Sequence, residues 1–188
     1  YLKKKFTGEI KTVIAYDCRK NSKSLARKVA EVFSANDIKV YLYSDLRSTP
    51  QLSFTVKHLK AQCGIVLTAS HNPPQYNGYK VYWEDGGQIV PPQDIEIIDQ
   101  IKKTQFANIL SKPKESLIEI ISDDLDKAFI KTSVKLGKLK LKSRANFKII
   151  FTSLHGTSIT AVPEVLEQAG YKNVHVVASQ AKPDGNFP

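Results

Sequence analysis

Ser70 and His71 directly follow a short apolar segment of the sequence, residues 64–68 (GIVLT), which has the pattern of a strand covered on both faces. A similar strand pattern over residues 10–16 (IKTVIAY) ends shortly before Arg19. Because parallel strands place their carboxyl ends at one edge of a sheet, we expect Arg19 and Ser70 to converge there. A hydroxyl, an imidazole and a guanidinium at one place suit the binding of a phosphate group.

Lys80 adds an ammonium group to this set if the segment that contains it folds back onto the sheet. Ser70 does not fit a Gly-x-Ser-x-Gly elbow, because Thr68 and Asn72 occupy the glycine positions. His71 is too close in the chain to act as the base of an ordinary serine triad. The sequence has no Gly-x4-Gly-Lys-Ser/Thr loop, no Gly-x-Gly-x-x-Gly loop and no zinc-type spacing of Cys and His. A serine that carries a phosphoryl group is the interpretation that remains.

The segments that must position these groups alternate between β-rich and helical patterns. Predicted strands at residues 10–16, 38–43 and 64–68 alternate with two predicted helices, in the order β-α-β-α-β. The first helix carries Leu25, Val29, Val32 and Phe33 at helical spacing, with Asn21 or Ser22 as its cap, and the second covers residues 50–60. This order predicts a parallel sheet with helices on both faces. Residues 79–90 predict a hairpin around a glycine-containing turn, and helical patterns follow near residues 95–101 and 123–136. The predicted fold class is a three-layer α/β/α domain, with a mainly parallel sheet and an appended hairpin.

A second α/β unit of similar pattern begins near residue 146. Its predicted elements are a strand, a helix and a strand, at residues 147–152, 157–170 and 173–178. We therefore predict a first domain over residues 1–145, with a basic connector at its end, and the incomplete start of a second domain over residues 146–188. His155 and Gly156 follow the first strand of this second unit and have two interpretations: a position that faces the ligand cleft, or close packing at the glycine with Thr157 as a helix cap. The second interpretation is favoured.

The 188 residues include 28 Lys and Arg against 18 Asp and Glu, a formal net charge of +10. The excess is concentrated in residues 127–148, and no acidic residue occurs from 127 to 163. A solvated helix face and a connector are the favoured interpretation, and a field that attracts an anion or an acidic neighbouring domain is the alternative. No apolar run is long enough to span a bilayer, and two cysteines are too few for a disulfide framework. These features predict a cytoplasmic protein without a membrane or nucleic-acid partner.

Three motifs carry a resemblance to a known family. Residues 68–73 (TASHNP) resemble the active-site serine loop of the α-D-phosphohexomutase superfamily, the phosphoglucomutase/phosphomannomutase enzymes. Residues 77–83 (NGYKVYW) with 86–89 (GGQI) are most similar to its phosphoglucomutase/phosphopentomutase branch. Residues 17–22 (DCRKNS) match the family's Asp-x-Arg-x-x-Ser loop. All three stand in the family's order, so the resemblance is specific.

The resemblance implies a phosphosugar mutase, an isomerase that transfers a phosphoryl group within a hexose monophosphate. Ser70 would carry the group, donate it to the 1- or 6-phosphate sugar, and recover the other phosphate from a bisphosphorylated intermediate. Lys80 and Arg19 would manage proton transfer and charge at the serine. His71 would hold the loop or assist the transfer.

Motif position further implies that Arg19, Ser22 and Asn72 bind phosphate, and that Mg²⁺ binds an oxygen of phosphorylated Ser70. The family's Asp-x-Asp-x-Asp-Arg metal loop does not occur in the sequence. We therefore expect an N-terminal fragment that depends on the remaining domains of its polypeptide and is inactive alone. The sequence leaves glucose, mannose and pentose phosphates open as substrates. The alternative function is a non-catalytic phosphate- or polyanion-binding α/β module, supported only by the basic segment 127–148.

Overall fold

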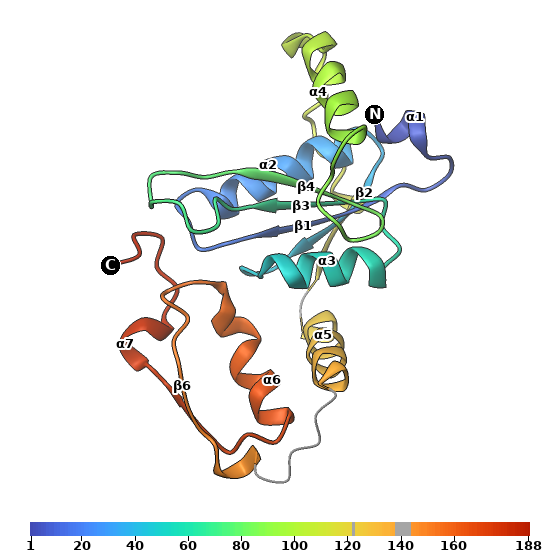
Figure 1. The fold of residues 1–188 in the computed structure, drawn as a ribbon. Coiled ribbons are helices and arrows are strands. Elements are labelled where there is room, and N and C mark those ends of the chain that lie inside the picture. Colours follow the sequence, from blue (N-terminus) through green and yellow to red (C-terminus); the bar gives the residue numbers. More distant parts are fainter. Residues whose placement is uncertain (122, 138–143) are drawn as a thin grey trace.

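The computed structural model describes residues 1–121, 123–137 and 144–188, and it contains two sheets (Figure 1). The larger sheet has the strand order β4-β3-β1-β2-β5. Its strands are β1 (Lys11–Tyr16), β2 (Lys39–Tyr43), β3 (Cys63–Leu67), β4 (Tyr79–Trp83) and β5 (Ile118–Ile121). All neighbours pair in parallel except β4, which runs antiparallel to β3. The predicted mainly parallel α/β/α fold is confirmed.

Helices α2 (Ser22–Ala35) and α3 (Thr49–His58) cover opposite faces of this sheet (Figure 1). Alternate residues of β1 serve the two faces, as the period of a strand requires. Ile14 belongs to the apolar cluster that contains Ala26 of α2, whereas Val13 belongs to the cluster that contains Leu52 of α3. All four of these side chains are fully buried. The first unit therefore has a core on each side of its sheet.

The path of the chain explains where a ligand can bind. From β1 the chain crosses through α2 to β2 on one side, and it then returns past β1 through α3 to β3 on the other side. The winding direction therefore reverses between β1 and β3. In open α/β sheets, ligands bind at the carboxyl ends of the strands beside such a reversal. The two loops that meet there are residues 17–21 and 68–78, at the left-hand end of the sheet in Figure 1.

Two details of the first unit differ from the sequence prediction. The second arm of the expected hairpin is not a strand, because only one bridge, Tyr82 to Gln88, pairs it with β4. Strand β5 was not expected, since it is short and includes the charged Glu119. It extends the sheet by pairing with β2, with Val40 opposite Ile118. Two further helices flank the sheet, α1 (Leu2–Lys5) and α4 (Gln93–Lys103), and the second of these was expected.

The second unit contains a two-stranded parallel sheet, β6 (Lys148–Phe151) and β7 (Asn173–Val176). Its helices are α6 (Val162–Gln168) and α7 (Ala178–Ala181). Helix α5 (Asp123–Leu136) precedes the predicted boundary, but it packs against α6 and is described with this unit. The expected single helix over 157–170 is divided into a 3₁₀ turn, Thr157–Thr160, and α6. Pro163 explains the division, because proline is favoured in the first turn of a helix and not within one. The sequence predicts an extended or linker-like basic connector over residues 138–144, and all of it except Arg144 lies outside the described residues.

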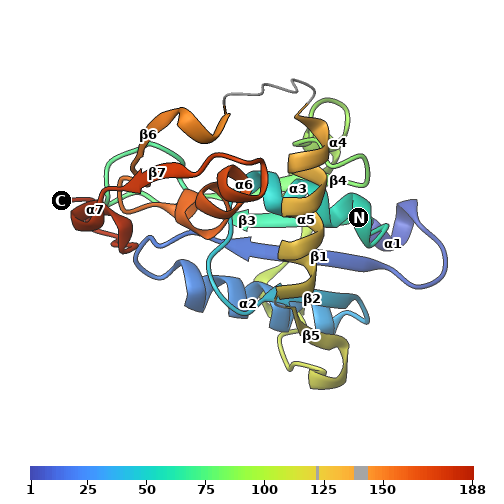
Figure 2. The same ribbon diagram turned by 90° about the horizontal axis from the view of Figure 1, so that it is seen from below.

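Polar contacts join the two units on the side of α3 (Figures 1 and 2). Arg47, next to α3, donates from Nε and Nη2 to the carboxylate of Asp126 in α5, at 2.6–2.9 Å. The amide of Gln51 donates to the same carboxylate at 2.9 Å, and its oxygen accepts from Thr160 at 3.1 Å. Gln51 and Arg47 are buried, so this network fixes α5 and the 3₁₀ turn against the first unit. None of the described helices is long and apolar enough to cross a membrane.

Candidate active site

The loop after β3 presents Ser70 at an unusual backbone position. Ser70 has a φ of +58°, in the left-handed region that residues other than glycine rarely adopt. Its amide donates to Oγ1 of Thr68 at 3.0 Å, which holds this conformation. The neck of the loop is closed by a hydrogen bond of 3.0 Å from the Thr68 amide to the Gly78 carbonyl. A Cβ at position 78 would lie 2.6 Å from the Thr68 carbonyl oxygen, so this closure requires glycine.

His71 and Asn72 stand beside Ser70 at the exposed tip of the loop. The hydroxyl oxygen of Ser70 lies 3.4 Å from Nδ1 of His71, and both side chains are exposed. The amide of Asn72 donates to the carbonyl of Ala69 at 3.1 Å, which forms a turn under the serine. A hydroxyl, an imidazole and a carboxamide therefore face solution together, and all three can form hydrogen bonds to a phosphate.

Arg19 lies behind this loop and holds it together. Its guanidinium donates to four main-chain carbonyl oxygens of the loop, at 2.5–3.0 Å: those of Ser70, Asn72, Pro73 and Tyr76. Its Nε lies 3.3 Å from Oδ2 of Asp17 in an ion pair that lacks hydrogen-bond geometry. Only 4% of Arg19 is exposed. Arg19 and Ser70 do meet at the predicted edge, and the contacts make Arg19 a support of the serine loop rather than an open phosphate ligand.

Ser22 has a similar supporting position. It is fully buried, donates to Oδ1 of Asp17 at 2.8 Å and accepts from Asn77 at 2.9 Å. The same Asp17 oxygen accepts from the amide of Arg19 at 2.9 Å. The Asp-x-Arg-x-x-Ser pattern therefore builds a connected network between the loops after β1 and β3. In this arrangement the Ser22 hydroxyl has no access to a phosphate in solution.

Lys80 lies on β4, opposite Val66 of β3. Directly opposed residues of antiparallel strands share a face, so Lys80 stands on the α3 side of the sheet, because Val66 packs in the cluster with Leu52. The lysine is half-buried and is not among the residues that line the cleft at Ser70. The structure thus brings Ser70, His71, Asn72 and Arg19 together. Lys80 is the second residue of β4 and lies outside the lining of their cleft.

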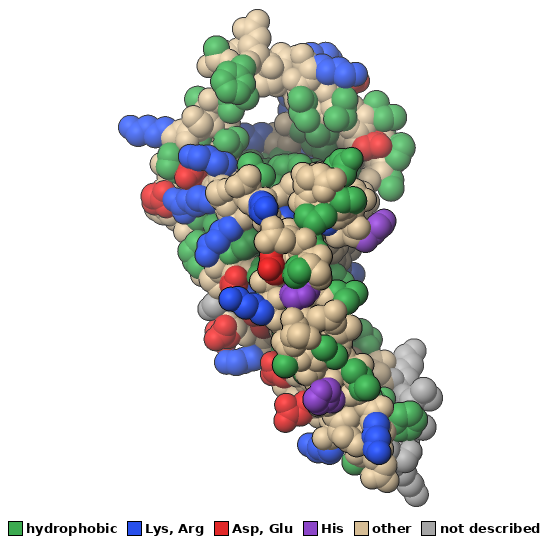
Figure 3. Space-filling view, turned by 90° about the vertical axis from the view of Figure 1, so that its left-hand side faces the viewer, with side chains coloured by type: hydrophobic (Ala, Val, Ile, Leu, Met, Phe, Trp, Pro, Cys, Tyr) green, Lys and Arg blue, Asp and Glu red, His purple; other side chains and the backbone are tan. Residues whose placement is uncertain are grey.

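A cleft of about 500 Å³ contains Ser70, and both units line it. The first unit contributes Arg19 and the serine loop. The second unit contributes residues 153–156 and the C-terminal residues Phe187 and Pro188. Figure 3 looks onto this side of the molecule, where histidine side chains lie among hydrophobic, acidic and basic groups. The sequence left a cleft-facing position open for His155 and favoured loop packing, and the structure places His155 in the lining of the cleft. Its position after a strand and before a helix was the available signal.

The C-terminal loop closes one side of this cleft. Figure 1 shows the chain rising from the second unit to the loop end of the first sheet. The ring of Phe187 stacks over the guanidinium of Arg19, with 5.1 Å from its centroid to Cζ. A Cβ at Gly185 would lie 2.6 Å from the carbonyl oxygen of Cys18, so the two backbones touch there. The Cys18 thiol, half-buried, has a raised pKa because of burial and of Asp17, which argues against a nucleophilic thiolate.

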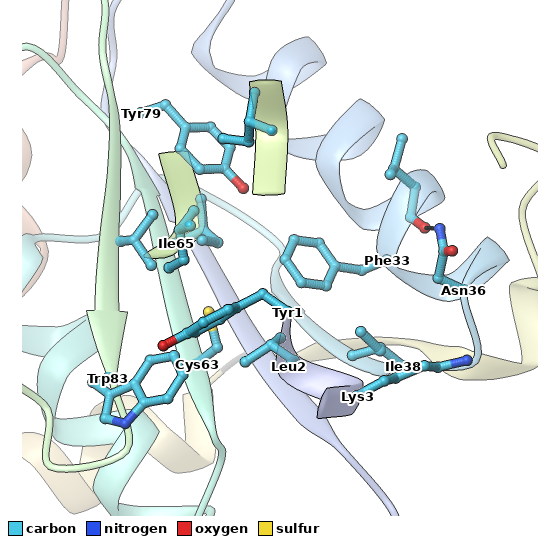
Figure 4. A pocket seen from close by; sticks show the side chains of 14 residues that line it. Tyr1, Leu2, Lys3, Phe33, Asn36, Ile38, Cys63, Ile65, Tyr79 and Trp83 are labelled. Atoms are coloured by element: carbon cyan, nitrogen blue, oxygen red, sulfur yellow. Dashed lines mark hydrogen bonds between the residues drawn. The ribbon is translucent and has the colours of Figure 1, made fainter. Parts of the chain in front are cut away.

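A second cavity, of about 400 Å³, lies between α1, α2 and the sheet (Figure 4). Its lining is mostly apolar and includes Phe33, Ile65 and Trp83, with the sulfur of Cys63 among them. None of the predicted site residues lines it. Among the described residues, Lys3 is the one Lys or Arg in this lining, and no serine or histidine accompanies it, so the cleft at Ser70 is the better candidate for phosphate transfer.

The described residues do not form a magnesium site by themselves. No group of three or more His, Cys, Asp or Glu side chains within them is arranged to hold a metal ion. The side chains described along the cleft provide two hydroxyls, an amide, two imidazoles and a guanidinium, but no carboxylate. Mg²⁺ prefers carboxylate and phosphate oxygens. Binding through Ser70 would therefore need a phosphate on that serine and carboxylates from elsewhere, and it stays a prediction.

Comparison with known proteins identifies the family. Residues 1–108 match the family model of phosphoglucomutase/phosphomannomutase α/β/α domain I, and residues 127–188 match that of domain II. The chain belongs to the phosphoglucomutase/phosphomannomutase family. The domain boundary predicted at 145 remains a prediction, and the second family model begins within α5 at residue 127.

Individual relatives agree with this assignment. A phosphoglucomutase of Staphylococcus epidermidis is 38% identical over 181 residues, which is 93% of this chain and 33% of that protein. A protein of Haemophilus influenzae named as a probable phosphomannomutase is 36% identical, over 98% of this chain and 38% of its own length. A phosphoglucomutase/phosphomannomutase family structure from Burkholderia thailandensis, 23% identical, shares the fold with a TM-score of 0.73; the match covers 96% of this chain and 38% of that one. The chain thus spans about a third of the length of these relatives.

Proposed function

We propose that the complete protein is a phosphohexose mutase in which Ser70 carries the transferred phosphoryl group. The observation that supports this best is the presentation of Ser70. Its hydroxyl is exposed at a left-handed corner of a braced loop, at the winding reversal of the sheet, in a cleft that both units line. Buried supports and one exposed hydroxyl are the arrangement that a positioned nucleophile requires.

In the proposed reaction, the bond between phosphorus and Ser70 Oγ breaks as a sugar hydroxyl forms its own bond to phosphorus. The hydroxyl proton leaves the sugar, and a proton returns to Oγ. His71, with Nδ1 3.4 Å from Oγ, is placed to hold that proton. The reverse transfer from the other carbon of the bisphosphorylated sugar restores phosphoserine. Mg²⁺, when bound, would neutralise charge on the phosphoryl oxygens.

The remaining predicted residues take distinct parts in this proposal. Arg19 and Ser22 position the serine loop through buried hydrogen bonds. Asn72 lines the cleft and contacts the bound phosphate. Lys80 supplies charge from the edge strand. Hexose phosphates and the further domains of the polypeptide are the proposed partners, catalysis requires those domains, and the location is cytoplasmic. Glucose, mannose and pentose phosphates all remain candidate substrates.

The alternative of a polyanion-binding module has less support. Within the described residues, the basic face of α5 is partly neutralised, because Lys127 lies 3.8 Å from Asp124. The family assignment and the braced serine loop have no explanation in that alternative. A salt-sensitive affinity for nucleic acid that falls with removal of the 127–148 charges would revive it.

The test uses the complete protein and its Ser70→Ala variant. Intact mass measurement is expected to show a species about 80 Da heavier in the wild type, which is absent from the variant. Conversion of glucose 1-phosphate to glucose 6-phosphate, followed with a coupled dehydrogenase, is expected to fall at least about 1,000-fold. Ser24→Ala, at an exposed position on α2, is the matched control and should keep both properties. Full activity of Ser70→Ala would refute the proposal.

A further inference from the structure

His155 occupies a strained position on the wall of the cleft that the second unit contributes. Both Leu154 and His155 have positive φ values, +47° and +60°, although neither is glycine. Each such residue costs free energy that the surrounding structure must offset, and these outliers concentrate at binding and catalytic sites. The strain turns the chain after β6 so that residues 153–156 line the cleft with Ser70 and His71.

Hydrogen bonds fix which nitrogen of the His155 ring carries a proton. Nδ1 lies 3.0 Å from the carbonyl oxygen of Lys182. A carbonyl only accepts, so Nδ1 donates and the neutral ring has its free lone pair on Nε2. Among the described residues, Nε2 has no hydrogen-bond partner. The ring is therefore held at one nitrogen and available at the other.

The main chain of His155 ties this ring to the first unit. Its carbonyl accepts from the thiol of Cys18 at 3.2 Å and from the amide of Asp184 at 3.0 Å. Its amide donates to the carbonyl of Gln180 at 3.0 Å. Cys18 is next to Arg19, which holds the serine loop. The position of the imidazole relative to Ser70 is thus set through a short series of contacts.

Asp184, whose carboxylate interacts electrostatically with His155, already accepts other hydrogen bonds. Asp184 accepts at Oδ1 from the amide and the side chain of Asn186, at 2.8 and 3.0 Å. The pKa of Asp184 is lowered, chiefly by the Asn186 backbone hydrogen bond and to a lesser extent by the side chain of Asn186, His155 and Lys182. No carboxylate side chain is among the described residues that line the cleft, so an anion there faces side chains that are mainly donors and imidazoles.

We propose that His155 is a phosphate-binding residue of the Ser70 cleft, with Nε2 in contact with an oxygen of the phosphoryl group. The proposal rests on the function proposed above, because it places a phosphate at Ser70. A neutral ring accepts the proton of a monoprotonated phosphate, and a protonated ring donates to the phosphate oxygen. The second unit then contributes a ligand of its own to a site that the sequence assigned to the first unit alone.

The chain itself allows a direct test, since it has four histidines, His58, His71, His155 and His175. Their imidazole C2–H signals can be followed by NMR while inorganic phosphate is added at constant pH and ionic strength. We expect the signals of His71 and His155 to shift along one saturation curve. The signals of His58 and His175 serve as internal controls and should stay in place, and the spectrum also reports whether each variant is folded.

Two substitutions separate binding from support. In His155→Asn the side-chain amide can replace Nδ1 as the donor to Lys182, but nothing replaces Nε2. We expect about tenfold weaker phosphate binding for this variant, measured by the His71 shift, because a charge-assisted hydrogen bond is lost. His175→Asn, on the exposed side of β7, is the matched control and should bind phosphate as the wild type does.

The outcomes distinguish this inference from the proposed function. If His71 responds while His155 does not, or if His155→Asn binds phosphate as tightly as the wild type, the inference is wrong and the Ser70 site stands. If phosphate moves neither His71 nor His155, the inference is wrong as well. The phosphoserine measurement on the complete protein then decides separately whether the proposed function also fails.

Discussion

The two sheets of the molecule differ in how well their strands are covered. The strands β1 and β3 are buried over nearly their whole length, whereas β6 and β7 alternate between exposed and half-buried residues. Ile65 of β3 is 1% exposed and Ile150 of β6 is 78% exposed. The first sheet has a helix on each face, and the described part of the chain covers the second sheet on one face only. The cleft at Ser70 therefore has one wall on a sheet that is buried on both faces, from the first unit, and one wall on a sheet that is partly exposed, from the second unit.

This difference assigns separate roles to the two walls. The serine loop rests on buried groups, Arg19 and Ser22, that are in turn fixed by Asp17. The wall from the second unit depends on a few polar contacts, chiefly those of His155 and of the Arg47–Asp126 network. We infer that the first wall sets the geometry of the nucleophile, and that the second wall is the one that adapts to a ligand.

The largest expected change in stability comes from replacing an isoleucine in each of the two sheets, which tests the difference in coverage between them. Ile65→Ala, in the core between β3 and α2, should lower the free energy of unfolding by about 3 kcal/mol, because it leaves a cavity among buried side chains. Ile150→Ala should change it by less than about 0.5 kcal/mol, since that side chain is already in solvent. Urea unfolding followed by circular dichroism measures both. Equal losses would show that the second sheet is covered as well as the first.

An intermediate effect is expected at the support of the serine loop. Arg19→Met removes the donors to four carbonyl oxygens and leaves the carboxylate of Asp17 without its buried partner. We expect a loss of about 2–3 kcal/mol in unfolding free energy and faster amide exchange within residues 68–78. Hydrogen exchange read by mass spectrometry and urea unfolding give the two quantities.

The matched control for Arg19 is Arg27→Met on α2. Arg27 is 37% exposed in its side chain and pairs with Glu31 and Glu115 at the surface, so its removal should cost less than about 1 kcal/mol. If Arg27→Met loosened the serine loop as much as Arg19→Met, the buried network would not be what holds Ser70.

The smallest effect concerns alkaline pH. Burial raises the pKa of Tyr43, in the first unit, to about 12, against about 10 in an unfolded chain. A raised folded pKa means that the stability from this group is complete below pH 10 and is lost as the pH rises from 10 to 12. Near pH 11 the loss is about 1 kcal/mol from Tyr43, and Tyr16, also raised to about 12, adds to it.

Tyr43→Phe should therefore reduce the fall of the urea midpoint between pH 9 and pH 11. The variant also loses the 2.6 Å hydrogen bond to Thr55, so it is compared with itself across pH and not with the wild type at one pH. Tyr171→Phe, at a half-exposed position of the second unit, is the control and should leave the pH dependence unchanged. An unchanged fall in Tyr43→Phe would show that Tyr43 is not a source of the alkaline loss.

Local patterns predicted most of the fold and the first half of the site. The apolar runs at β1 and β3 and the helical spacing of α2 and α3 identified the parallel sheet, and from it the meeting of Arg19 and Ser70. Strand β5 was missed because a four-residue edge strand with a charged residue has a weak signal. The second arm of the hairpin and the uninterrupted helix over 157–170 were wrong, since pairing and the effect of Pro163 depend on neighbours that spacing does not show.

The second half of the site lies beyond local patterns. Arg19 donates to carbonyl oxygens of the serine loop and not to an open phosphate site. This depends on the path of a loop more than fifty residues away in the sequence, which local patterns do not show. His155 and Phe187 reach the cleft because of how the two units pack. The contacts that place them there join residues more than 130 positions apart in the sequence. The sequence shows a histidine at position 155, but only the packing of the two units decides whether it lines the cleft.

The contact of Gly185 with the Cys18 carbonyl determines how the two units can turn relative to each other. With backbone against backbone and no side chain between them, there is no flexible group to absorb a rotation. Any hinge motion that widens the cleft must first separate this contact and lift Phe187 from the guanidinium of Arg19. A motion that separates the two walls of the cleft would therefore also expose the face of the Arg19 guanidinium that Phe187 covers.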